Sequence, residues 1–383
     1  ASHTRSGRIH AGSRLVTMTH IHSGEVEEPL SYRLLTIQSH VACGYVGNRS
    51  ATFPSQLLGW DVDAVNTVQF SNHTGYGRWG GQRMDAAHIT GLLEAIESNG
   101  LLRQNRVLTG YTPSPEALCA VEAFIRKLRE QKPDMIYLLD PVMGDMDRGM
   151  YVNADVLPVY RRMLPLSTII CPNQYEAQVL ADENITCLDS LYRVLEKLHT
   201  VYKVPHVVIT SLDLPPADLA KLGVEPTMSD GKPTMLLVGS SWTGHLSPWF
   251  LTFPSQGEYF SGVGDLFAAL VLARFAEHAH ELPEAARTPL SDIPPSSKEE
   301  CALPISRAVM LAVASLQHVL TRTRATMEAE GARLGLDPFA PAHKASVEDR
   351  VQIMRMRELK IIQSAPAILQ PQVQYRPRWM PTS

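Results

Sequence analysis

The sequence is organised around the stretch Phe260-Ser261-Gly262-Val263-Gly264-Asp265-Leu266-Phe267-Ala268-Ala269-Leu270. Glycine permits backbone conformations that other residues forbid, and the apolar run after Asp265 predicts a helix. The N–H groups that begin a helix form a site for anions, so Asp265 would lie beside a bound anion in the first turn. A kinase needs amides that stabilise a phosphoryl group and a carboxylate that accepts a proton from an alcohol. The alternative is a glycine-rich turn in which Asp265 only begins a helix.

The composition narrows the class of protein. The 383 residues are 44% hydrophobic, which is enough for a sizeable core. The net charge of −4 gives no indication of a nucleic-acid or acidic membrane partner, and no run of about 18 apolar residues predicts a membrane span. The five cysteines form no CxxC pair, so we expect free thiols in a reducing compartment rather than a zinc site or disulfides.

The two ends of the chain differ from its middle. Three arginines precede the first acidic residue, Glu25, in residues 1–30, and we favour a disordered tail over a mitochondrial presequence because the apolar face is poor. The predicted location is the cytoplasm, with a nuclear pool left open. After the tail we expect one domain over residues 31–340. This domain contains insertions at about 213–257 and 279–304. A C-terminal extension over 341–383 follows it and is expected to be partly loose.

Buried strands alternate with helices along most of the chain. Strands are expected at residues 34–39, 61–70, 106–111, 135–141, 166–171, 206–211, 235–238 and 248–253. Helices are expected at residues 51–58, 85–98, 115–131, 190–202, 265–275 and 308–321, with Asn48 as a cap of the first and Asn173 as the cap of another short helix. The alternation predicts an α/β fold with a mainly parallel central sheet covered by helices on both faces.

Polar residues end several of these strands: Ser39, Asp140, Asn173, Thr210 and Ser211. Ligands of parallel sheets bind beyond the carboxyl ends of the strands, so we expect these side chains to converge on one edge. The sequence contains no GxxxxGK[ST] stretch, and a phosphate site at this edge would therefore not be a P-loop.

Two acids lie in one strand-end loop, Asp140-Pro141-Val142-Met143-Gly144-Asp145. Mg²⁺ near phosphates is typically held by one or two carboxylates and several waters. Asn173 and Glu176 lie one helical turn apart and could face the same metal and phosphates through water. The alternatives are that Asp140 caps a turn, that Asp145 is solvated, and that Asn173 and Glu176 form a simple capping box.

Three further features could belong to a functional site: two ring side chains and one polar segment. His73 and Tyr111 follow predicted strands, where either could pack on or hydrogen-bond to a flat polar ring; ordinary surface chemistry is the alternative. The segment from Asp145 to Tyr151 would serve as a lid, because phosphoryl transfer benefits from excluding water, and a plain surface loop is the alternative.

Taken together, these stretches resemble the pyridoxal kinases of the ribokinase-like superfamily, over about residues 32–211 and 258–325, with a weaker similarity from Arg355 to Gln374. The matching stretches include Thr36-Ile37-Gln38-Ser39-His40-Val41, Gly44-Tyr45-Val46-Gly47-Asn48-Arg49, Ser71-Asn72-His73-Thr74-Gly75-Tyr76, Leu108-Thr109-Gly110-Tyr111, Cys171-Pro172-Asn173-Gln174-Tyr175-Glu176-Ala177 and Gly262-Val263-Gly264-Asp265-Leu266-Phe267. The resemblance implies a three-layer α/β/α fold. It also implies transfer of the γ-phosphate of ATP to the 5′-hydroxymethyl group of pyridoxal, pyridoxine or pyridoxamine.

The same resemblance implies a role for each matched residue. Asp265 matches the catalytic base, and Gly262, Val263 and Gly264 match the anion hole. The positions around the pyridine ring are Ser39, Val46, Phe70, His73, Thr74 and Tyr111. The positions that contact ATP are Asn173, Thr210 and Ser211, and those of the metal–phosphate region are Asp140, Asp145 and Glu176. The family implies Mg²⁺ with ATP, a monovalent cation such as K⁺ near Asp140 and Thr210, and a homodimer.

Some features depart from the family pattern. Val263 stands where many members have threonine, so any hydroxyl contact is lost there. The segment from Asp145 to Tyr151 is a few residues shorter than in animal relatives, and the adenine pocket is not assigned because residues 213–257 and 279–300 match poorly. Two other functions stay open. The ring contacts weigh against a hydroxymethylpyrimidine kinase of thiamine synthesis, and the presence of Asp265, Asp140 and Asp145 weighs against a non-catalytic vitamin-binding protein.

Overall fold

The computed structural model describes residues 32–257, 259–287 and 297–381, so the tail predicted over residues 1–30 lies outside the described residues. The strands of the main sheet are β1 (Arg33–Val41), β2 (Asp61–Phe70), β3 (Gly81–Arg83), β4 (Arg106–Thr109), β5 (Ile136–Leu139), β8 (Ile169–Ile170), β9 (His206–Leu212), β10 (Thr234–Trp242), β11 (Leu246–Pro254) and β12 (Arg378–Trp379). A separate hairpin consists of β6 (Gly144–Asp145) and β7 (Gly149–Met150).

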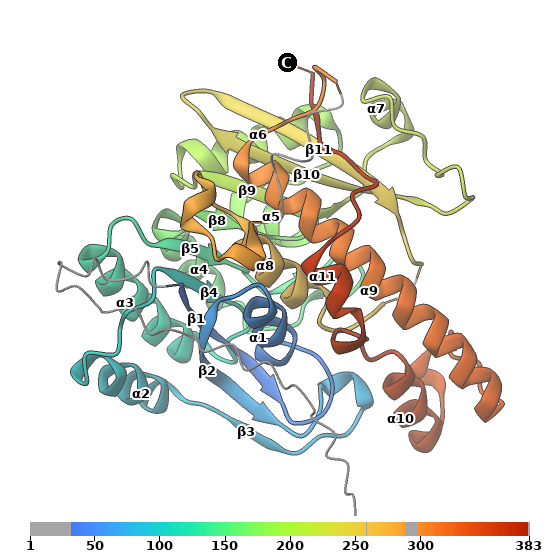
Figure 1. Ribbon diagram of the computed structural model, residues 1–383, viewed down its shortest axis with the longest axis horizontal. Coiled ribbons are helices and arrows are strands. Elements are labelled where there is room, and N and C mark those ends of the chain that lie inside the picture. Colours follow the sequence, from blue (N-terminus) through green and yellow to red (C-terminus); the bar gives the residue numbers. More distant parts are fainter. Residues whose placement is uncertain (1–31, 258, 288–296, 382–383) are drawn as a thin grey trace, which may run out of the picture. The chain divides into compact units, whose positions relative to one another are not determined.

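The order of the strands confirms the predicted sheet. The order is β12-β11-β10-β9-β8-β5-β4-β1-β2-β3, and Figure 1 shows it from β11 at the top to β3 at the bottom. The strands from β9 to β2 in this order are parallel, whereas β3 at one edge and β10, β11 and β12 at the other pair antiparallel. The sheet is therefore parallel in its centre, where ligand sites at strand ends are expected.

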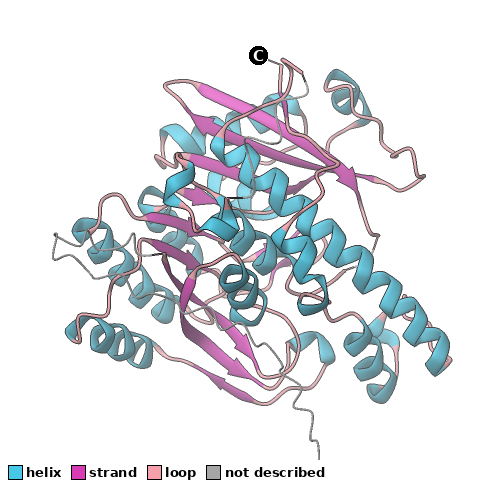
Figure 2. Cartoon of the chain, viewed as in Figure 1, coloured by secondary structure: helices cyan, strands magenta, loops and turns pink. Residues whose placement is uncertain are grey.

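Helices cover both faces of the sheet, as Figure 2 shows. One face carries α1 (Asn48–Leu57), α8 (Val263–Arg274), α9 (Pro304–Leu334), α10 (Val347–Met356) and α11 (Ala365–Leu369). The other face carries α2 (Ala86–Ser98), α3 (Pro115–Gln131), α4 (Val156–Met163), α5 (Gln174–Ala181), α6 (Leu188–Thr200) and α7 (Pro216–Lys221). Successive strand residues alternate between the two hydrophobic cores: Leu34 and Leu138 enter one, and Leu35 and Leu139 enter the other. The three-layer arrangement is confirmed.

Two regions contain more regular structure than the sequence indicated. Residues 213–257, expected mainly as an insertion, supply the long strands β10 and β11 of the main sheet. The helix expected over 308–321 continues as α9 to Leu334. The sequence after Thr321 is mostly polar, but Thr323, Met327 and Gly331 follow one another at four-residue spacing and are all buried. This narrow buried face extends the helix.

The C-terminal extension, predicted to be partly loose, packs against the rest of the domain over much of its length. Two helices of this segment, α10 and α11, lie on the same core as α9. Its last described strand, β12, pairs with β11, where the Arg378 guanidinium lies 4.7 Å from the centroid of the Phe250 ring. Met380 is buried. Backbone pairing and a few apolar contacts thus hold a segment whose composition is largely polar.

A glycine in the sheet leads to a stability prediction. A Cβ at Gly239 would lie 2.1 Å from the Trp249 ring on the neighbouring strand, and Trp249 is fully buried. We expect Gly239→Ala to lower the free energy of unfolding by about 1–3 kcal/mol, because the core would be overpacked. Gly91→Ala is the control: it lies in α2 with nothing within 4 Å, and alanine favours a helix by roughly 0.5–1 kcal/mol. Urea unfolding measures both, and equal stability of the two variants would contradict the tight contact.

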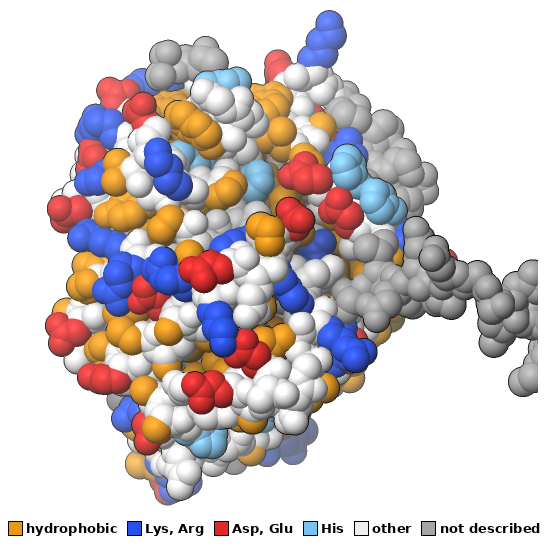
Figure 3. Space-filling model, turned by 90° about the vertical axis from the view of Figure 1, so that its left-hand side faces the viewer, with side chains coloured by type: hydrophobic (Ala, Val, Ile, Leu, Met, Phe, Trp, Pro, Cys, Tyr) orange, Lys and Arg blue, Asp and Glu red, His pale blue; other side chains and the backbone are white. Residues whose placement is uncertain are grey.

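The surface and the thiols agree with the composition. In the face shown in Figure 3, Lys and Arg side chains are interspersed with Asp and Glu rather than gathered in a single-charge patch. Among the described residues no helix is long and apolar enough to cross a membrane. All five cysteines are free thiols, of which Cys171 and Cys301 are buried.

Candidate active site

The carboxyl ends of the parallel strands bring the predicted residues to one edge of the sheet. Ile37 pairs with Thr109, and Thr109 pairs with Leu139. The residues that follow these positions are Ser39, Tyr111 and Asp140, so they lie at neighbouring strand ends. The backbone N–H of Thr210 donates to the Pro172 carbonyl oxygen at 3.0 Å, which brings the end of β9 beside Asn173.

The turn that leads into α8 requires glycine. Gly262 has a φ of 81°, in the left-handed region, and a Cβ there would lie 1.9 Å from the Tyr45 carbonyl oxygen. The first backbone hydrogen bond of α8 runs from the Leu266 N–H to the Gly262 carbonyl oxygen at 3.0 Å. The N–H groups of Val263, Gly264 and Asp265 therefore lie in the first turn of the helix, where backbone donors have no partner within the helix, and their action as an anion hole stays a prediction.

Asp265 lies in the first turn of α8, as predicted, but it caps no helix. Burial raises the pKa of Asp265 above its ordinary value, while a hydrogen bond from the Gly47 backbone N–H acts in the opposite direction. The Gly47 backbone is itself packed against Ser39, because a Cβ at Gly47 would lie 2.0 Å from the Ser39 carbonyl oxygen. The end of β1 and the carboxylate of Asp265 are thus joined through Gly47.

Two further buried carboxylates lie at this edge: Asp140 is close to both Asp265 and Glu176. Asp140 follows β5 and is 6% exposed, and its Oδ2 lies 4.0 Å from where a Cβ of Gly264 would stand. Burial raises the pKa of Asp140 well above its usual range, and the negative charges of Glu176 and Asp265 raise it further. Burial likewise raises the pKa of Glu176 to about 7, although backbone N–H groups counteract part of this effect. Such mutual repulsion is relieved by a cation.

Glu176 also has a structural role. Its Oε1 accepts the Met143 N–H at 2.9 Å, and its Oε2 accepts the Asn173 N–H at 2.9 Å. The Asn173 Oδ1 accepts the Glu176 N–H at 2.9 Å, which confirms the capping box. The Asn173 side-chain amide donates to the Gly144 carbonyl oxygen at 2.7 Å. The helix cap therefore fixes the loop that carries Asp140 and Asp145.

The donor set fits a divalent metal ion bound together with phosphates. Both oxygens of Glu176 accept hydrogen bonds from the backbone, so Glu176 would act on a metal through water. Within the described ranges no three His, Cys, Asp or Glu side chains are arranged as a complete metal cluster. Mg²⁺ usually takes one or two carboxylates, waters and substrate phosphates rather than an all-protein cage.

The repulsion among these carboxylates leads to a pH prediction. An acid whose pKa is raised on folding stabilises the fold below its unfolded pKa of about 4.5, and this contribution is lost as pH rises through about 7. Mg²⁺ binds the ionised form. We therefore expect MgCl₂ to raise the melting temperature more at pH 8 than at pH 5.5, relative to NaCl of equal ionic strength. Equal shifts at the two pH values in thermal scans would count against the site.

The segment from Asp145 to Tyr151 forms the hairpin β6–β7. Asp145 Oδ1 accepts the Arg148 N–H at 2.8 Å within the hairpin. The Arg148 guanidinium lies 4.7 Å from the centroid of the Tyr259 ring, in the loop that leads to α8. Tyr151 is exposed. A hairpin that touches the loop before α8 is placed to cover the site, and its action as a lid remains a prediction.

The predicted ring contacts divide into two groups. Val46, Phe70 and Tyr111 come together in a small hydrophobic cluster with Val41 and Val68. Thr74 is exposed and begins a single 3₁₀ turn, Thr74–Tyr76, after His73. The His73 ring is nearly buried and contacts a carboxylate, so it does not show ordinary surface chemistry. An apolar wall beside polar groups suits a flat heteroaromatic ring.

Two residues of this region have roles that the sequence did not reveal. Asn48 was expected to cap a helix, but Gly47 takes that position. The buried Asn48 amide instead donates to the Val65 carbonyl oxygen at 3.0 Å and accepts from Thr36, joining β1 to β2. Glu358, in the C-terminal segment, is buried under the loops that follow β1 and β2. The weak similarity from Arg355 to Gln374 was the available signal for Glu358.

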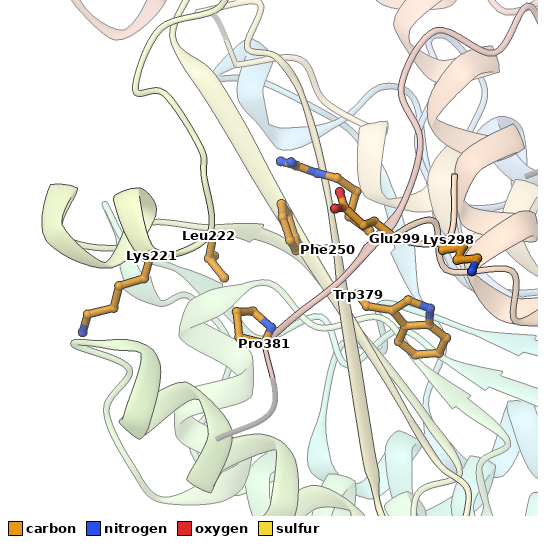
Figure 4. A pocket seen from close by; sticks show the side chains of 8 residues that line it. Lys221, Leu222, Phe250, Lys298, Glu299, Trp379 and Pro381 are labelled. Atoms are coloured by element: carbon orange, nitrogen blue, oxygen red, sulfur yellow. The ribbon is translucent and has the colours of Figure 1, made fainter. Parts of the chain in front are cut away.

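Two hollows lie away from these residues. The first, of about 360 Å³, lies at the β11–β12 edge of the sheet (Figure 4) and is lined by Lys221, Leu222, Phe250, Lys298, Glu299, Arg378, Trp379 and Pro381. The second, of about 710 Å³, lies between α9, the end of β11 and the C-terminal segment, and Gln256, Gln317 and Tyr375 are among its lining residues. None of the predicted site residues lines either hollow.

Comparisons with known proteins agree with this geometry. A family model described as phosphomethylpyrimidine kinase matches residues 82–289. The chain is 41% identical to the pyridoxal kinase of Sus scrofa, over 68% of this chain and 80% of that protein. It is 34% identical to the pyridoxal kinase of Arabidopsis thaliana, over 90% and 93%. A solved structure of pyridoxal kinase from Leishmania donovani in complex with ADP and pyridoxamine matches with a TM-score of 0.69 at 29% identity, covering 91% of this chain and 100% of that one.

Proposed function

Because the chain belongs to the pyridoxal kinase family, we propose that it is an enzyme that transfers the γ-phosphoryl group of ATP to the 5′-hydroxymethyl group of pyridoxal, pyridoxine or pyridoxamine. The products from pyridoxal are pyridoxal 5′-phosphate and ADP. The observation that carries the proposal is the meeting of Asp265, the amides that begin α8 and Asp140 at one edge of the sheet, beside the cluster of Val46, Phe70 and Tyr111.

Each part of this site has a task in phosphoryl transfer. Val46 and Phe70 form an apolar wall for the pyridine ring, and Ser39, His73, Thr74 and Tyr111 supply polar contacts around it. Asp265 accepts the proton of the 5′-hydroxyl group as the oxygen attacks the γ-phosphorus. Burial makes Asp265 a stronger base than an exposed aspartate. The N–H groups of Val263 and Gly264 stabilise the charge on the transferring group. These contacts are made by the backbone, so valine at position 263 can replace threonine there.

The metal and nucleotide contacts are proposed on the donor set described above. Asp140, Asp145 and Glu176 would hold Mg²⁺ directly or through water, and Asn173, Thr210 and Ser211 would contact ATP. The metal supplies neutralisation of the phosphate oxygens when bound. K⁺ or another monovalent cation would lie near Asp140 and Thr210. The lid would be the β6–β7 hairpin. A homodimer in the cytoplasm remains a prediction, and sedimentation of the purified protein would measure the oligomeric state.

The experiment for this proposal is a balance of products. Purified protein is incubated with Mg·ATP, K⁺ and pyridoxal, and ADP and pyridoxal 5′-phosphate are both measured. We expect the two products to accumulate one for one. ADP formed without pyridoxal 5′-phosphate would contradict the assigned acceptor, and neither product, with ATP still bound, would favour the non-catalytic vitamin-binding function.

One observation favours a second candidate function, that of a hydroxymethylpyrimidine kinase. The family model that matches residues 82–289 carries the description phosphomethylpyrimidine kinase. The match begins after Ser39, Val46, Phe70 and His73, so it does not include most of the proposed ring contacts. The relatives at 41% and 34% identity, which match 68% and 90% of this chain, are pyridoxal kinases, and the acceptor proposed above follows them.

A further inference from the structure

The C-terminal segment packs directly beneath the loop that carries His73. The Arg350 Nε of α10 donates to the Gly75 carbonyl oxygen at 3.0 Å. Met354, on the same helix, stands 3.0 Å from where a Cβ of Gly75 would be. This loop therefore rests on residues almost three hundred positions later in the chain, and its shape depends on them.

The closest link is the carboxylate of Glu358, which is buried. Its Oε2 accepts the Tyr45 N–H at 2.9 Å, and its Oε1 accepts the Tyr76 O–H at 2.9 Å. The same Oε1 lies 3.3 Å from the His73 Nε2. Burial alone would raise the pKa of Glu358, but the donors from His73, Tyr76 and Tyr45 together lower it below its ordinary value. A buried carboxylate with this many donors remains ionised.

The contact with Glu358 determines which nitrogen of His73 carries a proton. A carboxylate accepts only, so the proton lies on Nε2. The other nitrogen, Nδ1, lies 3.5 Å from the Ser261 Oγ, and in this tautomer it accepts from the serine hydroxyl. Ser261 directly precedes Gly262. A chain of contacts thus runs from the C-terminal segment through His73 to the turn that begins α8.

We propose that Glu358 is a positioning residue of the vitamin pocket: its carboxylate fixes the tautomer and ring orientation of His73 and ties the loops after β1 and β2 to the turn that begins α8. The inference rests on the proposed function, because it assigns His73 to the wall of the pyridoxal site. Glu358 is not among the proposed contacts of the vitamin or of ATP, and it acts through His73, Tyr45 and Tyr76.

The substitution Glu358→Gln tests the proposal, because it removes the negative charge of the side chain and hardly changes its size. We expect the KM for pyridoxal to rise about tenfold, while the KM for ATP and the melting temperature stay near those of the native protein. The pyridine ring loses an ordered wall, whereas the nucleotide side is untouched. Glu348→Gln, an exposed glutamate of α10, is the matched control and should leave both KM values unchanged. A rise of both KM values together with a lower melting temperature would reduce Glu358 to a structural role and overturn the proposal.

A second measurement does not depend on enzymatic activity. ¹⁵N NMR of histidine-labelled native protein, with His73 assigned by loss of its signals in His73→Gln, reports the protonated nitrogen. We expect a proton on Nε2 and none on Nδ1, and a mixture of tautomers in Glu358→Gln. A native His73 protonated at Nδ1 would overturn the proposal. Failure of the native protein to phosphorylate pyridoxal would reject the proposed function separately, since the tautomer is measured without substrate.

Discussion

Asp265→Asn is expected to reduce the turnover number for pyridoxal by about 10²–10⁴-fold, the usual contribution of a positioned general base. Asparagine has the shape of aspartate but cannot accept the proton of the 5′-hydroxyl group. The nucleotide contacts lie on other elements, so the affinity for Mg·ATP should remain nearly that of the native protein. Steady-state kinetics give the turnover number, and calorimetry gives ATP binding.

Asp134→Asn is the matched control for this change. Asp134 is exposed and lies just before β5, at the opposite end of the strand from Asp140, so its loss should leave turnover unchanged. If Asp265→Asn kept near-native turnover, Asp265 would not be the base. If it lost ATP binding together with turnover, its effect would be on the nucleotide site rather than on proton transfer.

Gly262→Ala is expected to reduce turnover by roughly 10²–10³-fold, the cost of losing an oxyanion-type donor. A Cβ would stand 1.9 Å from the Tyr45 carbonyl oxygen and 2.8 Å from the Ser50 Oγ, and a φ of 81° disfavours alanine in any case. The turn must shift, and the N–H groups of Val263 and Gly264 would then no longer point at the transferring phosphoryl group.

A second glycine separates backbone strain from the loss of the anion hole. Gly335 has a φ of 66° and ends α9, and a Cβ there would meet nothing within 4 Å. Gly335→Ala should therefore lower the melting temperature modestly and leave turnover unchanged. Turnover of Gly262→Ala equal to that of Gly335→Ala would show that the turn before α8 does not position the donors.

The parts of the site that could be predicted from the sequence are local. Asn173 and Glu176 lie three residues apart, so their capping box is visible in the sequence, and the structure confirms it. Asp140 ends a short apolar run, and Asp265 follows two glycines, which is sufficient to place both at helix or strand ends. The strand β2 was found at its expected bounds, Asp61–Phe70.

The parts that could not be predicted depend on contacts between distant residues. Glu358 is separated from Tyr76 by 282 positions and from Tyr45 by 313, and its surrounding sequence reads as polar. Asn48 occupies a typical capping position, yet its side-chain amide forms hydrogen bonds with four polar groups of β1 and β2. The end of α9 depends on single residues such as Met327 that are buried by the C-terminal segment. These partners lie too far apart in the sequence to be recognised from any short stretch of it.

The most direct test of the central claim is a competition between two acceptors. Purified protein receives Mg·ATP, K⁺ and an equimolar mixture of pyridoxal and hydroxymethylpyrimidine, and mass spectrometry measures the two phosphorylated products. The proposed ring contacts predict that pyridoxal 5′-phosphate dominates. Dominant pyrimidine phosphate would leave the fold and Asp265 in their proposed roles, but it would contradict the assignment of Ser39, His73 and Tyr111 to a pyridoxal pocket.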